Sequence, residues 1–228
     1  MTHLIDNTRT YFFGRSYYEI VSCFGLHEGT LTGKRILDCS AGPSSFAAEA
    51  PKHGFEVVAS DPVFYRGYDS LKTLAYSDYE AMFARVRAKS GLFVEKTFKS
   101  VEEAEKDRYG ALKIFLEDYK KYYPVGRYIS AELPRLPFED LSFGTVICGH
   151  LLFLYSFDYD FHVESILEMC RVAAEEVRIH PLVTMSGEMH PEVGPLMELL
   201  VSKGYRPEII EVDHEFFKGS NKTMVIRK

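Results

Sequence analysis

The chain has 228 residues, of which 46% are hydrophobic and 26% are charged, and its formal net charge is −6. These values are typical of a globular protein that is long enough to bury a substantial core. An acidic total argues against a general affinity for nucleic acid or for an anionic membrane. We therefore expect neither nucleic acid nor a membrane as a partner.

Signals for export and for metal binding are missing from the sequence. Residues 1–6 lack the basic and then apolar plan of a secretory signal, and no apolar run approaches the roughly 18 residues of a membrane span. The four cysteines and eight histidines are dispersed, without Cys-x-x-Cys or paired ligand spacing. We therefore expect a cytoplasmic protein with reduced thiols and no metal site.

The predicted elements alternate between strand and helix over most of the chain. Strands are predicted at 35–39, 56–60, 145–148, 176–179, 209–212 and 223–226, and helices at 45–50, 161–174 and 192–203. This alternation indicates an α/β protein with an open, mostly parallel sheet. The last two strands are joined by a short connection, so they are expected to be antiparallel, because a parallel pair needs a longer crossover.

Residues 62–127 interrupt this alternation of strands and helices. They carry 13 basic and 10 acidic side chains, a net charge of +3, while the rest of the chain carries 14 and 23, a net charge of −9. The segment also holds 13 of the 32 Phe and Tyr residues. Basic side chains among aromatic ones raise the possibility of RNA binding, but the interleaved acidic residues favour a solvated helix surface.

Two amphipathic helices are predicted within this segment. The apolar positions of the two helices are Leu71, Leu74, Ala75, Tyr79, Met82, Phe83 and Val86, and then Leu112, Phe115, Leu116, Tyr119 and Tyr123. Ser100 and Glu103 have the spacing of a capping box at the start of the second helix, and Pro124 ends it. A loop after the second strand emerges at the carboxyl edge of the sheet, so we expect these helices to cover a binding cleft there.

The first strand and the turn after it predict a nucleoside site. Residues 36–46 read Ile-Leu-Asp-Cys-Ser-Ala-Gly-Pro-Ser-Ser-Phe, and Asp61 closes the next strand, where a carboxylate can accept both ribose hydroxyls. The turn keeps only Gly42 of a dinucleotide-binding G-x-G-x-x-G pattern, and Pro43 removes an amide that could meet a phosphate. The turn therefore favours a ligand without a diphosphate.

Four segments in this order resemble the class I S-adenosylmethionine-dependent methyltransferases, in particular the subset that modifies small molecules. They are Leu-Asp-Cys-Ser-Ala-Gly-Pro-Ser at 37–44, Ser-Asp-Pro at 60–62, Ser-Ala-Glu with Leu-Pro-Phe-Glu-Asp-Leu-Ser-Phe at 130–143, and Val-Ile-Cys-Gly-His at 146–150. The similarity covers residues 35–61 and 128–226. It implies a Rossmann-like, doubly wound sheet of seven strands, mostly parallel with an antiparallel last strand, and a helical insertion after the second strand.

The resemblance also implies S-adenosylmethionine as cofactor and a set of binding residues. These are Asp38, Ser40, Ala41, Gly42, Asp61, Pro62, Ser130, Ala131 and Gly149. In this interpretation Ser40 to Gly42 lie against the methionine end, Asp61 holds the ribose, and Ser130 and Ala131 flank the adenine. Gly149, with His150, borders the methionine amine and the reacting centre.

Four residues depart from the family's usual pattern. Ser40 and Ser44 stand where glycines are usual, Ser130 where an aspartate often binds the adenine amino group, and Gly144 where an aspartate usually follows Ser-Phe. Serine is small enough for the first two positions, so cofactor binding is still expected.

Three further residues are candidates for the site. Arg15 precedes the first strand, where its guanidinium either pairs with the cofactor's carboxylate or lies on a solvated helix face. His150 is either a general base or a residue that only shapes the pocket. A base is not obligatory, because in-line methyl transfer depends mainly on positioning. Tyr155, together with Tyr11 and His180, is a weaker candidate of the same kind.

These observations favour a single methyltransferase domain over residues 1–228, with residues 62–127 as a helical cap. We expect it to use S-adenosylmethionine to methylate an O or N nucleophile of a small-molecule acceptor, as a monomer or a homodimer. One alternative is a non-catalytic cofactor-binding or adaptor protein, which would use the aromatic insertion to contact a partner. Another is an NAD-dependent oxidoreductase, which should show a glycine-rich turn that this chain lacks.

Overall fold

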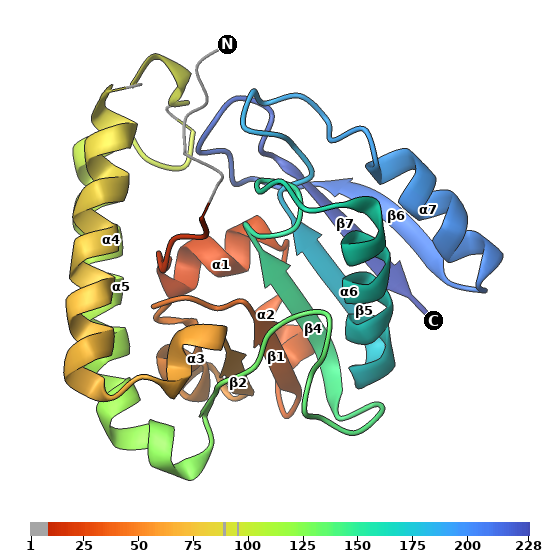
Figure 1. Cartoon of the computed structure of the whole chain (residues 1–228), viewed down its shortest axis with the longest axis horizontal. Coiled ribbons are helices and arrows are strands. Elements are labelled where there is room, and N and C mark those ends of the chain that lie inside the picture. The colour runs from red at the N-terminus through yellow and green to blue at the C-terminus, as the bar shows by residue number, and fades with distance from the viewer. Residues whose placement is uncertain (1–8, 89, 95) are drawn as a thin grey trace.

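Seven strands form one sheet with helices on both faces (Figure 1). The computed structural model describes residues 9–88, 90–94 and 96–228. The strands are β1 (Arg35–Cys39), β2 (Glu56–Ser60), β3 (Tyr128–Ile129), β4 (Phe143–Gly149), β5 (Ala173–His180), β6 (Arg206–Glu211) and β7 (Lys222–Arg227). Their order is β3-β2-β1-β4-β5-β7-β6, so the strand order reverses between β1 and β4. Open α/β sheets bind ligands at the carboxyl ends of the strands beside such a reversal.

The strand directions confirm the predicted mostly parallel sheet. β1 pairs in parallel with β2 and β4, β2 with β3, and β4 with β5. β7 runs antiparallel to both β5 and β6, with Ile209 opposite Met224 in the last hairpin. The prediction that the last two strands are antiparallel is therefore confirmed.

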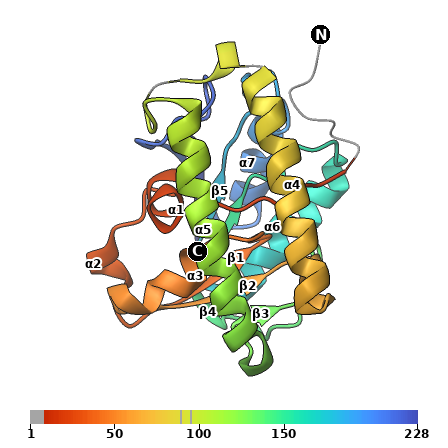
Figure 2. The ribbon, with the colours of Figure 1, turned by 90° about the vertical axis from the view of Figure 1, so that its left-hand side faces the viewer.

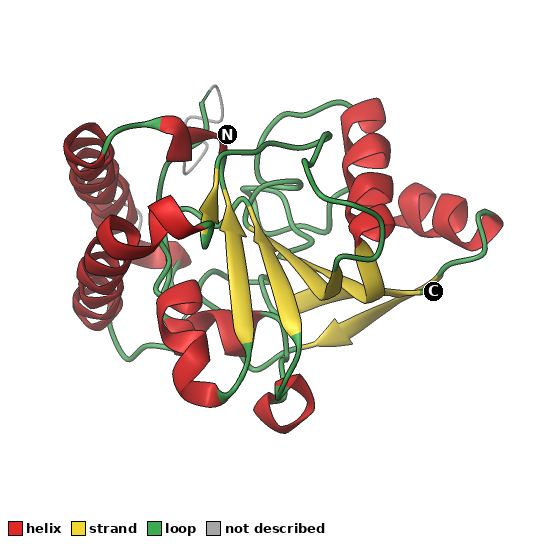
Figure 3. Ribbon diagram, turned by 90° about the horizontal axis from the view of Figure 1, so that it is seen from below, coloured by secondary structure: helices red, strands yellow, loops and turns green. Residues whose placement is uncertain are grey.

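The helices lie on the two faces of this sheet (Figure 3). They are α1 (Tyr17–Cys23), α2 (Glu28–Leu31), α3 (Phe46–Glu49), α4 (Tyr68–Ala88), α5 (Val101–Tyr122), α6 (Tyr159–Val172) and α7 (Val193–Ser202). Short 3₁₀ turns cover Ala50–His53, Pro62–Tyr65, Ser90–Leu92 and Tyr123–Val125. Within the described ranges, no helix combines the length and the apolar character that crossing a bilayer requires.

Alternating side chains of the central strands build two separate cores. Ile36 of β1 and Ile147 of β4 point to one face, where they pack with buried residues of α1, α3, α4 and α5. Leu37 and Val146 point to the other face and pack with α6 and α7. Successive residues of a strand face opposite sides of the sheet. A strand that helices cover on both faces is therefore mostly apolar on both of its sides.

The segment between β2 and β3 contains the two predicted helices, which lie side by side (Figure 2). Six of the seven predicted apolar positions of α4 are buried, and Leu74 is half-buried. The hydroxyl of Tyr79 donates a hydrogen bond of 2.6 Å to the carbonyl of Glu105, which joins α4 to α5. On α5, Leu112, Phe115, Leu116 and Tyr119 are buried, as expected.

The two ends of α5 differ in detail from the predicted ones. Ser100 caps the helix by accepting from the amide of Glu103, but the Glu103 carboxylate accepts from the amide of Lys99 instead of that of Ser100. Tyr123 lies beyond the last turn of α5, with 37% of its surface exposed, and its ring stacks on Tyr119. It leaves the apolar face because the helix ends before Pro124.

Replacement of Phe115 tests the packing of α5 on the rest of the fold. Phe115 is fully buried and contacts the rings of Phe12, Phe64 and Tyr128. Phe115→Ala should lower the free energy of unfolding by about 3–5 kcal/mol, measured by urea denaturation. The neighbouring Ile114, which is 39% exposed, is the matched control. Equal losses for Phe115→Ala and Ile114→Ala would contradict this packing.

Candidate functional site

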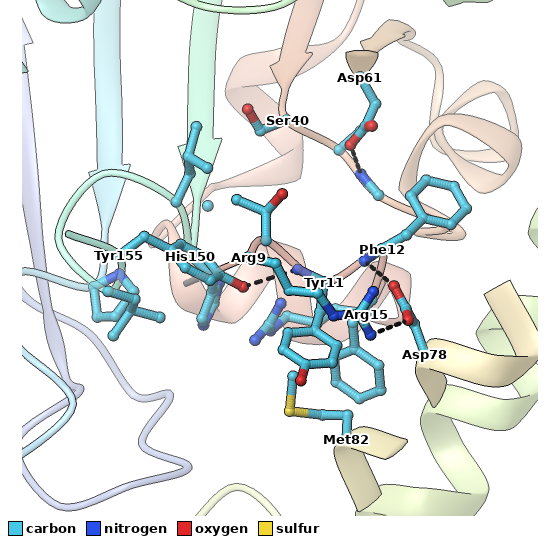
Figure 4. A pocket seen from close by; sticks show the side chains of 18 of the residues that line it. Arg9, Tyr11, Phe12, Arg15, Ser40, Asp61, Asp78, Met82, His150 and Tyr155 are labelled. Carbon is cyan, nitrogen blue, oxygen red and sulfur yellow. Dashed lines mark hydrogen bonds and ion pairs between the residues drawn. The ribbon is translucent and has the colours of Figure 1, made fainter. Parts of the chain in front are cut away.

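A cavity of about 570 Å³ opens at the carboxyl ends of β1, β2, β4 and β5 (Figure 4). Its size lies in the range typical of small-molecule sites. The predicted site residues that line it are Arg15, Asp38, Ser40, Ala41, Gly42, Asp61, Pro62, Gly149, His150 and Tyr155. Tyr11 lines it as well, so the structure brings together eleven of the fourteen candidates, on segments that are far apart in the chain.

The turn after β1 has a left-handed backbone at two residues. Gly42 has φ of 57°, and Ser40 has φ of 61°, where an L side chain is strained by about 1–2 kcal/mol. Strain of this kind is characteristic of functional sites. The amide of Ala41 donates to the carbonyl of Ser60 (3.0 Å), which holds the turn against the end of β2.

Asp61 bridges the ends of the first two strands. Its Oδ2 accepts a hydrogen bond from the amide of Gly42 (3.0 Å), and its Oδ1 accepts one from the amide of Val63 (3.1 Å). Burial raises the pKa of Asp61 to about 6, while the two amide hydrogen bonds oppose the rise. The carboxylate therefore supports the turn after β1 and lines the cavity at the same time.

Asp38 is a buried carboxyl group with an unsatisfied oxygen. It is 3% exposed, and its Oδ2 has no hydrogen-bond partner among the described residues. Burial and the nearby Asp61 raise the pKa of Asp38 to about 8, against the opposing charge of Arg15. A buried polar atom without a partner is uncommon, and one that lines a cavity is suited to a ligand.

Arg15 belongs to a buried cluster of charged side chains below the cavity. Its Nε lies 3.4 Å from Oε1 of Glu19, too far for a hydrogen bond, and Nε has no other hydrogen-bond partner among the described residues. Arg108 of α5 binds the same carboxylate through Nε (2.9 Å) and through Nη2. Two guanidinium groups therefore share one carboxylate. Burial, reinforced by Arg108, lowers the pKa of Arg15 to about 10.

His150 follows β4 in a left-handed conformation, with φ of 57°. Its amide donates to the carbonyl of His180 (2.6 Å), whereas its ring Nδ1 has no partner among the described residues. Burial, together with Arg15 and His180, holds the pKa of His150 well below its usual value. The ring is therefore neutral at neutral pH and lines the cavity with a nitrogen that is free to accept or donate.

The segment before α1 crosses the cavity and is tied to both of its sides. On one side the hydroxyl of Tyr155 accepts from the amide of Tyr11 (3.2 Å). On the other, the buried carboxylate of Asp78 in α4 accepts from the amide of Phe12 (2.9 Å) and from Arg9 (2.8 Å). Figure 4 shows Asp78 on one side of this segment and His150 and Tyr155 on the other.

Close packing fixes where this segment meets the turn after β1. The backbone at Gly14 lies against the peptide between Pro43 and Ser44, and a Cβ atom at position 14 would overlap the carbonyl group of Pro43. The carbonyl of Arg15 accepts from the hydroxyl of Ser44 and from the amide of Ser45. Glycine is therefore required at position 14.

Ser130, Ala131 and His180 are the three candidates that do not line the cavity. The hydroxyl of Ser130 donates to the carbonyl of Pro62 (3.2 Å), and Ala131 packs against the core on the α6 side. The next two residues, Glu132 and Leu133, line the cavity instead. The structure thus places the segment after β3 beside the cavity, one or two residues further along than expected.

Asp78 and Arg108 line the cavity but were not among the predicted site residues. Asp78 falls at helical spacing within the apolar positions of α4, between Ala75 and Met82, so its burial had a signal in the sequence. Arg108 had a weaker signal, because its partner Glu19 is far away in the chain. A lone charged residue on a helix is usually solvated.

Comparison with known proteins places the chain in a family. No family model matches the sequence. An uncharacterized protein of Methanocaldococcus jannaschii is 35% identical to it over 225 residues, which cover 96% of each chain. The chain belongs to the same family as this archaeal protein.

Solved structures with bound cofactor share the fold. Magnesium protoporphyrin IX methyltransferase of Synechocystis with bound S-adenosylmethionine is 12% identical, with a TM-score of 0.51 over 93% of this chain and 77% of that one. The same enzyme with bound S-adenosylhomocysteine gives 12% identity and a TM-score of 0.50, over 92% and 81%. Likeness at this level of identity concerns the fold. The chain has the class I methyltransferase fold, and the predicted strand arrangement is confirmed.

Replacement of Gly14 tests the contact between the N-terminal segment and the turn. The added Cβ atom of Gly14→Ala would push the N-terminal segment away from the peptide between Pro43 and Ser44. It should therefore lower the free energy of unfolding by about 2 kcal/mol or more, measured by urea denaturation. Gly110 lies inside α5 with open space around it. The control Gly110→Ala should raise the free energy by about 0.5–1 kcal/mol. A Gly14→Ala variant as stable as the unmodified chain would contradict the described packing.

The raised pKa of Asp38 predicts a pH dependence of stability. Its pKa rises from 3.8 to about 8 on folding, so the folded chain keeps a proton that the unfolded chain has lost. The free energy of unfolding should therefore fall as the pH rises from about 6.5 to 8. Buried histidines with lowered pKa, such as His214, act in the opposite direction, but below pH 6.5.

The variant Asp38→Asn removes this proton uptake. Urea denaturation at several pH values should give a smaller loss of stability over that range than the unmodified chain shows. The same slope in both proteins would contradict the assignment of the proton to Asp38.

Proposed function

We propose that this protein is an S-adenosylmethionine-dependent methyltransferase that methylates an O or N nucleophile of a small molecule. The observation that carries the proposal is the cavity at the strand ends of a class I methyltransferase fold, where a buried oxygen of Asp38 has no hydrogen-bond partner within the described part of the chain. When bound, S-adenosylmethionine supplies an electrophilic methyl group on a sulfonium. The remaining chemistry belongs to the residues of the chain.

The polar groups of the cavity fit the polar groups of this cofactor. A carboxyl group that is buried and unpartnered suits an ammonium group, so Asp38 would bind the methionine amine. An ammonium group there would lower the pKa of Asp38 and release its proton. Arg15, whose Nε makes no hydrogen bond to any residue that the structure describes, would pair with the methionine carboxylate. Asp61 would accept from the ribose hydroxyls while it keeps its two amide contacts.

The adenine end would lie at the side of the cavity formed after β3. Glu132 and Leu133 line the cavity there, whereas Ser130 is engaged with the carbonyl of Pro62. Glu132 is exposed, and its carboxylate is an acceptor for an amino group, the role that an aspartate often has at position 130 in the family. This arrangement supports cofactor binding despite the serine at position 130.

The rest of the cavity would hold the methyl acceptor. Its wall there is largely aromatic and apolar, formed by Tyr11, Met82, Phe157, Phe161, Phe216 and Phe217. Such a wall suits a small molecule with a flat apolar part. The solved neighbour, which is named for a porphyrin substrate, is an enzyme of this kind. Since α4 contributes Met82 and Asp78, we assign residues 62–127 the role of a cap over the acceptor.

His150 is the residue placed to hold the nucleophile. Its neutral ring lies beside Gly149 at the end of β4, and its Nδ1 has no hydrogen-bond partner in the ranges that the structure describes. It would accept a hydrogen bond from the hydroxyl or amine, orient it in line with the methyl group, and take its proton as the methyl arrives. Tyr155 has a raised pKa, caused mainly by burial, and would remain protonated.

Calorimetric titration with S-adenosylhomocysteine tests the proposal. Saturable binding in the micromolar range, with no heat from NADH, supports a methyltransferase over an oxidoreductase. Absence of binding at millimolar ligand would overturn the proposal. Binding of S-adenosylhomocysteine without methyl transfer to any member of a panel of hydroxyl and amine acceptors would favour the non-catalytic alternative.

Replacement of Asp61 tests the placement of the ribose. Asp61→Ala should weaken binding of S-adenosylhomocysteine by about 10–100-fold, because it removes a charged acceptor and leaves two amides of the site unpaired. The exposed Asp69 in the first turn of α4 provides the control variant, Asp69→Ala, which should bind normally. An unchanged dissociation constant in Asp61→Ala would mean that the ribose lies elsewhere.

A further inference from the structure

Three side chains with metal-binding atoms meet below the cavity. Cys23 is the last residue of α1, His180 is the last residue of β5, and His214 lies in the connection between β6 and β7. One ligand atom from each, the sulfur of Cys23 and a ring nitrogen of each histidine, lies within 4.8 Å of the other two. All three residues are at most 1% exposed.

Hydrogen bonding fixes the proton position on His180. The hydroxyl of Thr223 donates to the carbonyl of Cys23 (2.7 Å), so its hydrogen is already used. The oxygen of Thr223 must then accept from Nδ1 of His180, 2.9 Å away. The proton of the neutral ring is therefore on Nδ1, and Nε2 carries a lone pair. This Nε2 is buried and has no hydrogen-bond partner among the described residues.

His214 is held in a similar way. Its Nδ1 lies 3.3 Å from the hydroxyl of Thr97, which also accepts from the amide of Glu215 (2.9 Å). Its Nε2 lies 3.7 Å from Oε1 of Glu19, one helical turn before Cys23 on α1. Each imidazole is thus oriented by a threonine hydroxyl on one nitrogen, the support that metal-binding histidines typically have.

We propose that Cys23, His180 and His214 bind a divalent transition-metal ion of the zinc class. A thiolate with two imidazoles is a ligand set that suits Zn²⁺ and its substitute Co²⁺. Three protein ligands leave a fourth coordination position on the ion, which water or the carboxylate of Glu19 would occupy. Without a metal ion, the hydrogen of the Cys23 thiol can be donated to at most one of the two imidazole nitrogens. A metal ion would be coordinated by the lone pairs of all three ligand atoms.

Charge and proton balance are consistent with this site. Metal binding displaces the thiol proton of Cys23 to solvent, so the ion brings one net positive charge into the cluster. The carboxylate of Glu19, whose Oε1 lies 3.7 Å from Nε2 of His214, is the anion of this cluster. Arg15 and Arg108 also bind Glu19. Burial and the Glu19 carboxylate raise the pKa of the Cys23 thiol, and the two guanidinium groups act against that rise. Affinity for the metal should therefore rise with pH.

The ion would connect parts of the chain that build the cavity. It would tie α1 to the end of β5 and to the β6–β7 connection, whose Phe216 and Phe217 line the cavity. The ring of His180 also lies 5.2 Å, centre to centre, from that of His150. The spacing of cysteines and histidines along the sequence predicted no such site, because its three ligands are brought together only by the fold.

Cobalt(II) is the probe that tests this site. The full chain, freed of metal with a chelator, is titrated with Co²⁺ and followed by absorption. Bound thiolate should give a sulfur-to-cobalt charge-transfer band in the near ultraviolet, with saturation at about one equivalent. Zn²⁺ should displace the cobalt and, at about 100 times its dissociation constant, raise Tm by about 5–10 °C.

Variants show whether the named residues hold the ion. Cys23→Ala should abolish the charge-transfer band, whereas the control Cys170→Ala, which removes another buried thiol, should keep it. His214→Gln should weaken Co²⁺ binding at least tenfold. A metal-free wild-type chain that gives no thiolate band and no rise in Tm overturns the proposal, whether or not the variants fold. A band that survives in Cys23→Ala also overturns it.

Discussion

The hydrogen bond from the amide of Gly42 to Asp61 is the interaction on which the site depends. It joins the turn after β1 to the end of β2, and these two segments form one wall of the cavity. Because β1 and β2 are parallel neighbours, their carboxyl ends lie side by side, and a carboxylate at one end reaches the amides at the other. Asp61 and Asp38 are thereby brought close enough for Asp61 to raise the pKa of Asp38.

The N-terminal segment completes the wall by backbone contact. Gly14 allows it to lie directly on the turn after β1, and Asp78 and Tyr155 hold its amides from opposite sides. The buried cluster of Arg15, Glu19 and Arg108 continues from this segment to α5. A small molecule in the cavity would therefore contact the sheet, the N-terminal segment and the helices between β2 and β3 together.

Much of the fold was readable from the sequence because its signals are local. The strand predicted at 35–39, the helical stripe that includes Leu71 and Phe83, and the cap at Ser100 each depend on residues within a few positions of one another. β3 has only two residues, too few for an alternation to be recognised, and it was expected only from the resemblance to a family. The turn at 36–46 and Asp61 could be brought together from the residues alone, because parallel strands place their carboxyl ends at a common edge. Most of the other candidates that line the cavity were implied by the resemblance to a family.

What the sequence did not reveal depends on contacts between distant parts of the chain. Two such contacts leave no spacing pattern in the sequence: the pairing of Arg108 with Glu19, and the meeting of Cys23 with His180 and His214. The helical spacing of Asp78 indicates its burial but not its hydrogen bond to the N-terminal segment. The displacement from Ser130 to Glu132 also involves a contact between distant residues, because the hydroxyl of Ser130 donates to the carbonyl of Pro62. Local periodicity carries no information on such contacts.

A crystal structure of the chain with S-adenosylhomocysteine tests the central claim most directly. It should show the ribose hydroxyls on Asp61, the amine on Asp38 and the sulfur directed toward the part of the cavity beside His150. A ligand bound outside this cavity, or bound in it with neither carboxylate in contact, would contradict the assignment of the cavity as a methyl-donor site.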